Sequence, residues 1–497
     1  MATRLRLAKT PVSAVDRLDP HLAQITIDHQ TEQNLREQLT FAMKAKFDFM
    51  AFKSKKPQPP PVLISLFQEL DGHLIVPTLV AKSLPNYRPH PRVYPPVPVQ
   101  FTGTLRPAQV DVETEALAQL LATGTTTLGL YPGFGKTILA AHLVSRLNLL
   151  SVILVNREIL TTQWYNSFTQ NTTAIVWIVG QSNPPANCDV IICMDTRYYQ
   201  IDPELRKKIG IMIIDEAHSF CTPGDVGCLL AFEPKYLIIE TATLERDDDM
   251  HKMVYALAGT HGVFREVNIQ YDVIKIETGL VPVRTNSNHG TVVYDKLVKS
   301  CLFNPSRNNL IYNLIIANPM KTFLVLTSLV EHAELVNREL LALGMSSDCL
   351  CGTRKTYRDA QVLVGTVSKI GTGFDQKNAC ADYGGRPFDI LIMASSIKKQ
   401  GILIQSVGRV FRTKYPVVMF LVDNDKTFEN HWTCAKRWFT STGGKITIQA
   451  IDPAMFAKPM VRERIILDLE DDQPTRSNRS VADAANPINQ VLELVLE

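Results

Sequence analysis

The chain has 497 residues, 45% hydrophobic and 20% charged, which are the proportions of an ordinary globular protein with two or three domains. Its formal charge of +3 is too small for a general polyanion binder, so any nucleic-acid contact must come from a local groove. No stretch reaches the ~20 apolar residues of a membrane helix, and the N-terminus lacks the apolar core of a secretory signal.

Residues 1–100 differ from the rest of the chain in their proline content and are predicted to be a small accessory region. Leu63–Leu70 and His73–Val80, separated by Asp71-Gly72, predict a β-hairpin. The proline-rich stretch Pro85–Pro98 excludes a regular helix and predicts an extended linker. The residues themselves indicate no function for this region.

From Leu105 onward, short apolar runs alternate with helical patterns such as Thr137–Leu147. Continuous apolar strands with helical crossovers indicate a parallel sheet covered on both faces. The pattern restarts after residues 270–300, which predicts two similar α/β domains in tandem. The predicted strands of the first domain are Thr126–Tyr131, Ser151–Asn156, Val190–Met194, Ile211–Asp215 and Tyr236–Glu240, and those of the second are Thr322–Thr327, Gln361–Thr366, Asp389–Met393 and Val417–Val422.

A phosphate-binding loop is predicted at Gly133-Phe134-Gly135-Lys136-Thr137, between a strand and a helix. Glycines let backbone N–H groups approach phosphates closely, Lys136 would reach the terminal phosphates, and the Thr137 hydroxyl would ligate Mg²⁺. The usual first glycine of this motif is absent, because Leu130 occupies that position. By itself the pentapeptide could be a chance match.

Two carboxylates follow the apolar run Ile211–Ile214. A buried strand that ends in acids delivers them to the edge of the sheet where ligands bind in α/β proteins. Asp215 would hold Mg²⁺ through water, and Glu216 would orient and deprotonate the attacking water. The alternative is an acidic helix start without catalytic function, but the order of the two motifs favours an ATPase.

A basic pattern in the second domain completes this set of residues. Gln405, Arg409 and Arg412 are spaced by four and three residues, which would place them on one face of a single helix. Arginines from an opposing domain can neutralise charge that develops on a γ-phosphoryl group. A solvated basic helix face is the alternative.

The ordered set of motifs resembles the superfamily-two helicases. Within them it resembles the XPB-type branch and the transcript-release DNA helicases of poxviruses and other large cytoplasmic DNA viruses. The resemblance covers about Leu105 to Ile451 and implies two RecA-like parallel-sheet domains with an N-terminal accessory region. The implied boundaries are an accessory region at 1–100, an ATP-binding domain at 101–285, a second helicase domain at 286–455 and an acidic and polar tail at 456–497.

The resemblance also implies roles for individual residues, with ATP and Mg²⁺ as cofactors. Gln109 matches the adenine-reading Q motif, and the stretch from Tyr131 to Thr137, including Pro132 and Phe134, matches motif I. Thr241-Ala242-Thr243 matches the motif that couples ATP state to domain movement, although Leu244 replaces its usual proline. Residues implied near the nucleic-acid strand are Arg157, Thr196, Thr327 and Thr366, and those implied near the ATP are Gly373 and Asp375.

Two further segments carry hypotheses of their own. Tyr383 and Phe388 flank Gly384-Gly385 where related helicases carry a strand-splitting hairpin, although an inert surface loop is the alternative. Pro487–Glu497 predicts an amphipathic helix, which would either contact transcription machinery or dock on the chain itself.

The predicted partner is nucleic acid, with 3′-to-5′ movement on DNA implied by the resemblance and RNA left open, as is the oligomeric state. A duplex translocase that does not separate strands, a protein-translocating ATPase and an inactive scaffold are the other readings. Nine cysteines without a C-x-x-C pair favour an intracellular setting, which for a viral protein would be the host cytoplasm, with the virion as a second expected location.

Overall fold

The computed structural model describes residues 2–7, 25–43, 54, 57–70, 73–85, 87, 94–241, 248–267, 269–287, 292–371, 374 and 376–459. They form two compact units that divide between Glu266 and Val267. This division comes before the predicted boundary at residue 285, because the strand Tyr271–Glu277 pairs within the second sheet. Among the described residues, no helix has the length and apolar character to cross a bilayer.

The first unit contains a seven-stranded sheet in which all neighbouring strands are parallel. Its order is β13 (Val263–Arg265), β7 (Thr125–Leu130), β12 (Tyr236–Thr241), β11 (Ile211–Ile214), β8 (Ser151–Val155), β10 (Val190–Met194) and β9 (Val176–Ile178). The five predicted strands are confirmed to within one residue at each end. The short strands β9 and β13 lie at the sheet edges, where the sequence pattern is weakest.

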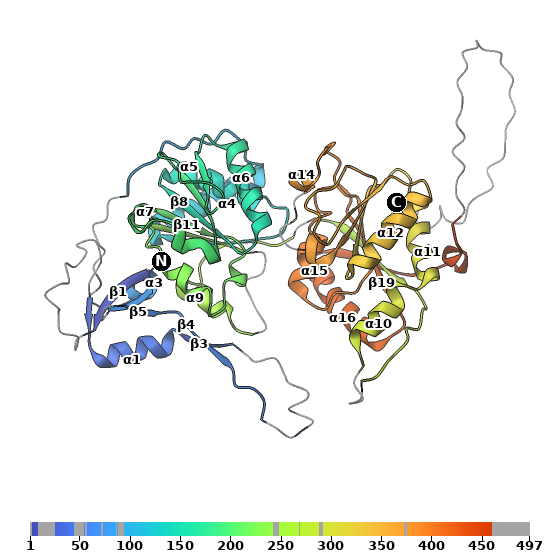
Figure 1. Ribbon diagram of the computed structural model, residues 1–497, viewed down its shortest axis with the longest axis horizontal. Helices are drawn as coiled ribbons and strands as arrows, with labels where there is room; N and C mark the ends of the chain where they lie inside the picture. The colour runs from blue at the N-terminus through green and yellow to red at the C-terminus, as the bar shows by residue number, and fades with distance from the viewer. Residues whose placement is uncertain are drawn as a thin grey trace, which may run out of the picture. The chain divides into compact units, whose positions relative to one another are not determined.

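Helices cover both faces of this sheet, as Figure 1 shows for α5 and α6 on one side of β8 and β11 and α9 on the other. One face packs against α4 (Pro107–Thr123), α5 (Lys136–Leu147) and α6 (Glu158–Asn171). The other face packs against α8 (Val226–Leu230) and α9 (His251–Ala258) together with side chains of the accessory region. The remaining helical segments of this unit are η1 (Asp195–Gln200), α7 (Pro203–Lys208) and η2 (Ala217–Ser219).

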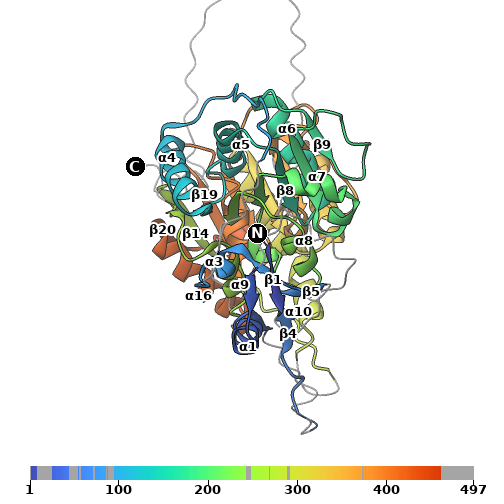
Figure 2. The same cartoon turned by 90° about the vertical axis from the view of Figure 1, so that its left-hand side faces the viewer.

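The accessory region has a small sheet of order β2 (Ile25–Ile27), β1 (Ala2–Leu7), β6 (His73–Pro77) and β5 (Gln68–Leu70), and a two-stranded ribbon of β3 (Thr40–Met43) and β4 (Val62–Ser65). Its described residues also include the helices α1 (His29–Gln38) and α3 (Thr78–Lys82). Both views place α1 and β4 at the end of the first unit away from α5 (Figures 1 and 2).

The predicted hairpin is confirmed only in part. Strands β5 and β6 are antiparallel, with Leu70 opposite His73. Pro77, which has no backbone N–H to donate, ends the second strand, so the chain from Thr78 onward is helical rather than extended. The predicted first strand is also split, because Val62–Ser65 pairs with β3 instead. The last described part of the proline-rich linker is non-helical, and its Tyr94 hydroxyl donates to the carbonyl of Glu233.

The second unit repeats the architecture with another parallel seven-stranded sheet. Its order is β16 (Ser347–Leu350), β17 (Val362–Thr366), β15 (Phe323–Thr327), β18 (Ile390–Met393), β19 (Val417–Val422), β14 (Tyr271–Glu277) and β20 (Gly444–Ala450). One face packs against α11 (Pro305–Ile316) and α12 (Val330–Ala342), and the other against α10 (Tyr294–Leu302), α13 (Val367–Ile370), α15 (Gln400–Val407) and α16 (Lys426–Ser441). Its described residues also include the short segments α14 (Gln376–Ala379) and η3 (Pro453–Phe456). Two tandem parallel-sheet domains with an accessory region are therefore confirmed.

Candidate active site

The loop between β7 and α5 has the backbone geometry of a phosphate cradle. Gly133 and Gly135 have φ values of 88° and 92°, a left-handed conformation that favours glycine. A Cβ atom on Gly135 would lie 2.6 Å from Nε2 of Gln109 and 2.7 Å from Nη2 of Arg106. Phe134, between the two glycines, is buried in the core cluster that includes residues of α5 and of the sheet, and this packing holds the loop in place. The N–H groups at the start of α5 are thereby available to an anion.

Gln109 contacts this loop rather than presenting its amide to a base. The side chain is 2% exposed, and its Nε2 donates to the carbonyls of Phe134 (3.2 Å) and Gly135 (3.1 Å). Its Oε1 accepts from the Arg106 N–H at 2.8 Å, which closes the capping box of α4. The predicted adenine contact is therefore not the role that the structure shows. Gln109 fastens the phosphate loop to α4.

Arg106 is a residue that the sequence prediction missed. Its Nη2 donates to the carbonyl of Gly133 at 3.2 Å, which holds a guanidinium group against the phosphate loop. The sequence feature that could have indicated Arg106 is its position directly before Pro107, the first residue of α4.

Lys136 and Asp215 lie on the α5 and α6 side of the sheet. Lys136 begins α5, and its Nζ donates to the carbonyl of Leu130 at 3.3 Å. Asp215 follows β11 and is 7% exposed, and its Oδ2 accepts from the indole N–H of Trp164 at 2.8 Å. Burial, and secondly the charge of Glu216, raises the pKa of Asp215 to about 6, and the Trp164 hydrogen bond and Lys136 act in the opposite direction.

Glu216 adopts a left-handed backbone conformation (φ 49°), which is uncommon for a residue with a side chain. Its Oε2 is buried without a hydrogen-bond partner among the described residues and lies 3.4 Å from Nδ1 of His218. The same His218 nitrogen lies 3.2 Å from the Thr241 hydroxyl at the end of β12. These contacts connect the acidic motif to Thr241, while 242–247, including Ala242, Thr243 and Leu244, lie outside the described residues.

A third acid, Glu240, was not predicted. It is 0% exposed, and neither carboxylate oxygen has a hydrogen-bond partner among the described residues. It lies on β12, opposite Leu128 of β7 and next to the strand that ends in Asp215. Burial, and secondly the charge of Asp215, raises its pKa well above the ordinary value. In the sequence, Glu240 follows an apolar run and resembles the polar residue at the end of a strand. Its burial therefore could not be predicted from the sequence.

The residues around this loop fit a nucleotide with magnesium. Thr137, in the first turn of α5, and Asp215 supply the hydroxyl and carboxylate oxygens that Mg²⁺ prefers. Gly133 is exposed, so the loop is open to a ligand. The unpartnered Oε2 of Glu216 is an acceptor that a water molecule would satisfy.

The second unit places the predicted basic residues differently from the expectation of one helical face. Helix α15 ends at Val407, and tight turns follow, in which Arg409 N–H donates to Ser406 and Val410 N–H to Val407. Gln405 therefore lies on the helix, and Arg409 and Arg412 lie in the turns after it. Arg412 is exposed, whereas Arg409 is half-buried. The Arg409 Nη1 donates to the carbonyl of Phe374, and its guanidinium lies 5.9 Å from that ring.

A family profile described as "Type III restriction enzyme, res subunit" matches residues 102–246. The chain is 27% identical over 400 residues to the protein 161L of Invertebrate iridescent virus 6, named as a candidate helicase, with coverage of 74% of this chain and 88% of that protein. It is 29% identical over 149 residues to the DNA 3′-5′ translocase XPB2 of Sulfurisphaera tokodaii, with coverage of 30% and 34%. A variant of S. cerevisiae Dbp5, solved with a variant of Gle1 and IP6, has a TM-score of 0.50 at 14% identity, with coverage of 71% and 95%, which shows the fold alone.

By these matches the chain is a helicase, and its fold is that of the superfamily-two helicases. It is thus an ATP-hydrolysing enzyme, and the helicase's phosphate loop and acidic motif both fall within the matched residues. Its particular nearness to the poxvirus enzymes remains a prediction.

The helicase presents two exposed residues at the same edge of its first sheet as the phosphate loop. Arg157 follows β8, and Thr196 follows β10 in η1. Because all strands of this sheet are parallel, these residues share the carboxyl edge with the loop after β7 and with Asp215 after β11. The residues predicted to bind the nucleotide follow β7 and β11, and the two exposed residues follow β8 and β10 on the same side of β11.

Thr327 and Thr366, implied to face a nucleic-acid backbone, are buried at 0% and 2% exposure. They are register partners at the carboxyl ends of β15 and β17. The Thr327 hydroxyl lies 2.7 Å from Nδ1 of His332, whose Nε2 lies 3.0 Å from Oδ1 of Asn308. Since an amide oxygen only accepts, His332 carries its proton on Nε2, and the Thr327 hydroxyl donates to Nδ1. Thr327 therefore has no proton left to donate to a phosphate.

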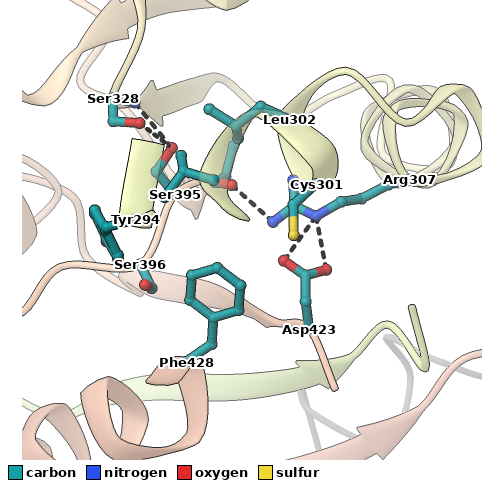
Figure 3. A pocket seen from close by; sticks show the side chains of 11 residues that line it. Tyr294, Cys301, Leu302, Arg307, Ser328, Ser395, Ser396, Asp423 and Phe428 are labelled. Carbon is teal, nitrogen blue, oxygen red and sulfur yellow. Dashed lines mark hydrogen bonds and ion pairs between the residues drawn. The ribbon is translucent and has the colours of Figure 1, made fainter. Parts of the chain in front are cut away.

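A small cavity of about 20 Å³, lined in part by Arg307, Ser328 and Ser395, lies in the second unit (Figure 3). Arg307 reaches it from α11, and its Nε donates to Asp423 at 2.8 Å and 3.1 Å, while its Nη2 donates to the carbonyl of Ala394 at 2.8 Å. Across the cavity, Ser395 donates to the Ser328 hydroxyl at 3.2 Å and accepts from the Ser328 N–H. The ion pair is 2% exposed at Arg307 and 4% at Asp423, so it joins α11 to the ends of β18 and β19 inside the fold.

One further prediction, the strand-splitting wedge at Tyr383 and Phe388, is corrected by the structure, and three others concern residues that the structure does not describe. Phe388 is 2% exposed and belongs to the core, and Tyr383 packs partly buried against it. The wedge hypothesis is therefore wrong for Phe388, because the residue is needed for packing. Gly373, Asp375 and Pro487–Glu497 lie outside the described residues.

Proposed function

We propose that this helicase is an ATP-driven translocase that moves 3′-to-5′ on DNA and acts in viral transcription, at the step of transcript release. The observation that carries the proposal is the shared carboxyl edge of the first sheet, which brings the phosphate loop, Asp215 and the exposed Arg157 and Thr196 to one side. The name of XPB2 supports the DNA substrate and the polarity. The viral relative supports a viral setting, which would place the helicase in the host cytoplasm and in the virion.

In the proposed mechanism, each polar group of the first unit has one task. Backbone N–H groups after Gly133 and the Lys136 ammonium bind the β- and γ-phosphates. Thr137 and Asp215 would hold Mg²⁺, which neutralises charge on the phosphates when it is bound. The Oε2 of Glu216, which accepts no hydrogen bond among the described residues, takes a proton from the attacking water. Gln405, Arg409 and Arg412 of the second unit complete the site when the two units close on the nucleotide.

The nucleic-acid contacts of the second unit are proposed to begin at Ser328 rather than at Thr327. The Thr327 proton is committed to His332, whereas the Ser328 hydroxyl accepts from Ser395 and keeps its own proton. Ser328 is exposed, so this proton can be donated to a phosphate oxygen. Contacts of this kind bind the phosphates of the nucleic-acid backbone, so the affinity for nucleic acid should depend on salt and not on base sequence.

The test is the ATPase rate of the purified chain with single-stranded DNA, duplex DNA, RNA or unfolded polypeptide at one fixed salt concentration. Single-stranded DNA should stimulate hydrolysis most, and a fork with a 3′ tail should be unwound in preference to one with a 5′ tail. K136A and E216Q should abolish turnover while the fold remains intact. Hydrolysis stimulated by RNA or polypeptide alone, or near-normal turnover by either variant, would contradict the proposal.

A partner in the transcription machinery is the finer part of the proposal, and its candidate contact is Pro487–Glu497. A chain ending at Asn486 should keep its DNA-stimulated ATPase and lose transcript release in a reconstituted assay. Unchanged release by this truncated chain would remove the partner contact from the proposal.

A further inference from the structure

One buried hydrogen bond joins helix α6 to the acidic motif. The indole Nε1 of Trp164 donates to Oδ2 of Asp215 at 2.8 Å, and Trp164 is 1% exposed. An indole N–H is a donor only, so it always presents the same partner to a carboxylate. This hydrogen bond occupies one Asp215 oxygen and leaves Oδ1 for a metal-bound water.

The packing of Trp164 keeps this donor in place. Its ring stacks on Phe168, one helical turn along α6, with 6.0 Å between the ring centres and 29° between the planes. Both rings belong to the core beneath the sheet, with Phe168 at 0% exposure. Because a close-packed ring has few alternative rotamers, the position of α6 determines the direction of the Asp215 carboxylate.

Helix α6 also begins at the predicted nucleic-acid edge. Its first residue, Glu158, follows the exposed Arg157 at the end of β8. A displacement of α6 caused by a strand at Arg157 would therefore reach Asp215 through Trp164, two turns along the helix.

We propose that Trp164 is a positioning residue that orients Asp215 toward magnesium and the nucleotide, and that it links this orientation to the place of α6 at the nucleic-acid edge. The proposal rests on the proposed function of Asp215 as the magnesium ligand. Groups that orient a metal-ligating side chain typically change metal affinity by ~10- to 100-fold when they are removed.

The chain offers a matched pair of variants. W164F retains an aromatic ring and loses the N–H. W177F removes the same kind of hydrogen bond elsewhere in the unit, because the Trp177 Nε1 donates to the carbonyl of Ser182 at 2.9 Å and the residue is 4% exposed. Binding of a fluorescent, non-hydrolysable ATP analogue is titrated with Mg²⁺ and, separately, in EDTA.

W164F should need ~10- to 100-fold more Mg²⁺ for half-maximal binding than the wild type, with unchanged affinity for the analogue in EDTA. W177F should match the wild type in both titrations. Addition of single-stranded DNA should lower the Mg²⁺ requirement of the wild type and of W177F but not that of W164F. An unchanged Mg²⁺ requirement in W164F would overturn the proposal.

A second measurement does not depend on the stability of W164F. The chain has four tryptophans, of which Trp432 and Trp438 lie in α16 of the second unit. In W177F/W432F/W438F, which keeps Trp164 as its single tryptophan, the fluorescence should therefore change when Mg²⁺ is added to protein bound to a non-fluorescent ATP analogue. A signal without any Mg²⁺ response would count against the proposal. D215N distinguishes failure of this proposal from failure of the proposed function. If D215N loses Mg²⁺-dependent binding and W164F keeps it, Asp215 is a magnesium ligand but Trp164 does not position it. If binding by the wild type does not depend on Mg²⁺, both roles are wrong.

Discussion

At the scale of single residues, the candidate site contains two carboxyl groups that are buried from solvent. Asp215 is 7% exposed and Glu240 is 0% exposed, and burial raises the pKa of both carboxyl groups. Asp215 has a compensating donor in Trp164, whereas Glu240 has no hydrogen-bond partner among the described residues. A buried carboxyl group without partners is costly when it is ionised, so Glu240 must reduce the stability of the nucleotide-free protein.

Glu240 provides a prediction about pH. Its folded-state pKa lies above the ordinary value of 4.5, so between the two pKa values the folded protein binds more protons than the unfolded chain. Stability must then fall as the pH rises through this window, by at most ~1.4 kcal/mol per pH unit. E240Q does not titrate, so its melting temperature relative to the wild type should rise as the pH increases from about 5, measured in EDTA without nucleotide.

The control for this prediction is E334Q, which alters an exposed acid of α12. Its melting temperature relative to the wild type should stay constant over the same pH range. A constant difference for E240Q as well would mean that the Glu240 carboxyl group finds a partner in solution and titrates normally.

At the scale of elements, the parallel strands could be predicted because each is a continuous apolar run bounded by turn residues. β10 and β19 match the prediction at both ends. The phosphate loop could be predicted as well, because close backbone approach requires glycine. The missed strand β14, by contrast, carries Asp272, Lys275 and Glu277, and Lys275 is buried only because it pairs with Glu277 and Glu429.

Side-chain partners and helix ends could not be predicted from spacing. The spacing of Gln405, Arg409 and Arg412 suits a helix, but α15 ends before the arginines. Gln109 and Thr327 have residue types that suit a ligand, yet their polar atoms are used by neighbours that lie far away in the sequence or on another element. Each of these depends on tertiary contacts that a local pattern does not contain.

The buried pair of Arg307 and Asp423 gives a prediction at this scale. It joins α11 to β18 and β19 through three hydrogen bonds of the Arg307 side chain. R307M leaves a buried carboxylate without its counter-ion, which should reduce the free energy of unfolding by ~3–5 kcal/mol. Urea unfolding followed by the fluorescence of Trp432 and Trp438 would report this loss in the second unit.

A surface pair in the same unit is the matched control. Arg354 contacts Asp348 at 2.8 Å, the same distance, but its side chain is 47% exposed. R354M should therefore cost less than ~1 kcal/mol. Equal effects of the two variants would show that burial of Arg307 is not what makes its pair important.

At the scale of the whole molecule, the predicted groups of the catalytic site come from both units. The phosphate loop, Asp215 and Glu216 belong to the first unit, and Gln405, Arg409 and Arg412 belong to the second. Each sheet is complete by itself, since every paired strand has its neighbours within its own unit. Folding and nucleotide binding can thus depend on one unit, while hydrolysis under the proposed mechanism requires both.

The arginines test this division of labour. R409A should leave the affinity for the ATP analogue within a few-fold of wild type, because the binding groups are in the first unit, and should lower kcat by ~10³-fold or more. R409K keeps the positive charge without the planar donor pair, so it should retain the fold and still lose most of the rate. R437A, which changes an exposed arginine of α16, is the control and should change neither quantity. Parallel losses of affinity and kcat in R409A would assign Arg409 to binding alone, and a wild-type kcat would exclude Arg409 from the chemical step.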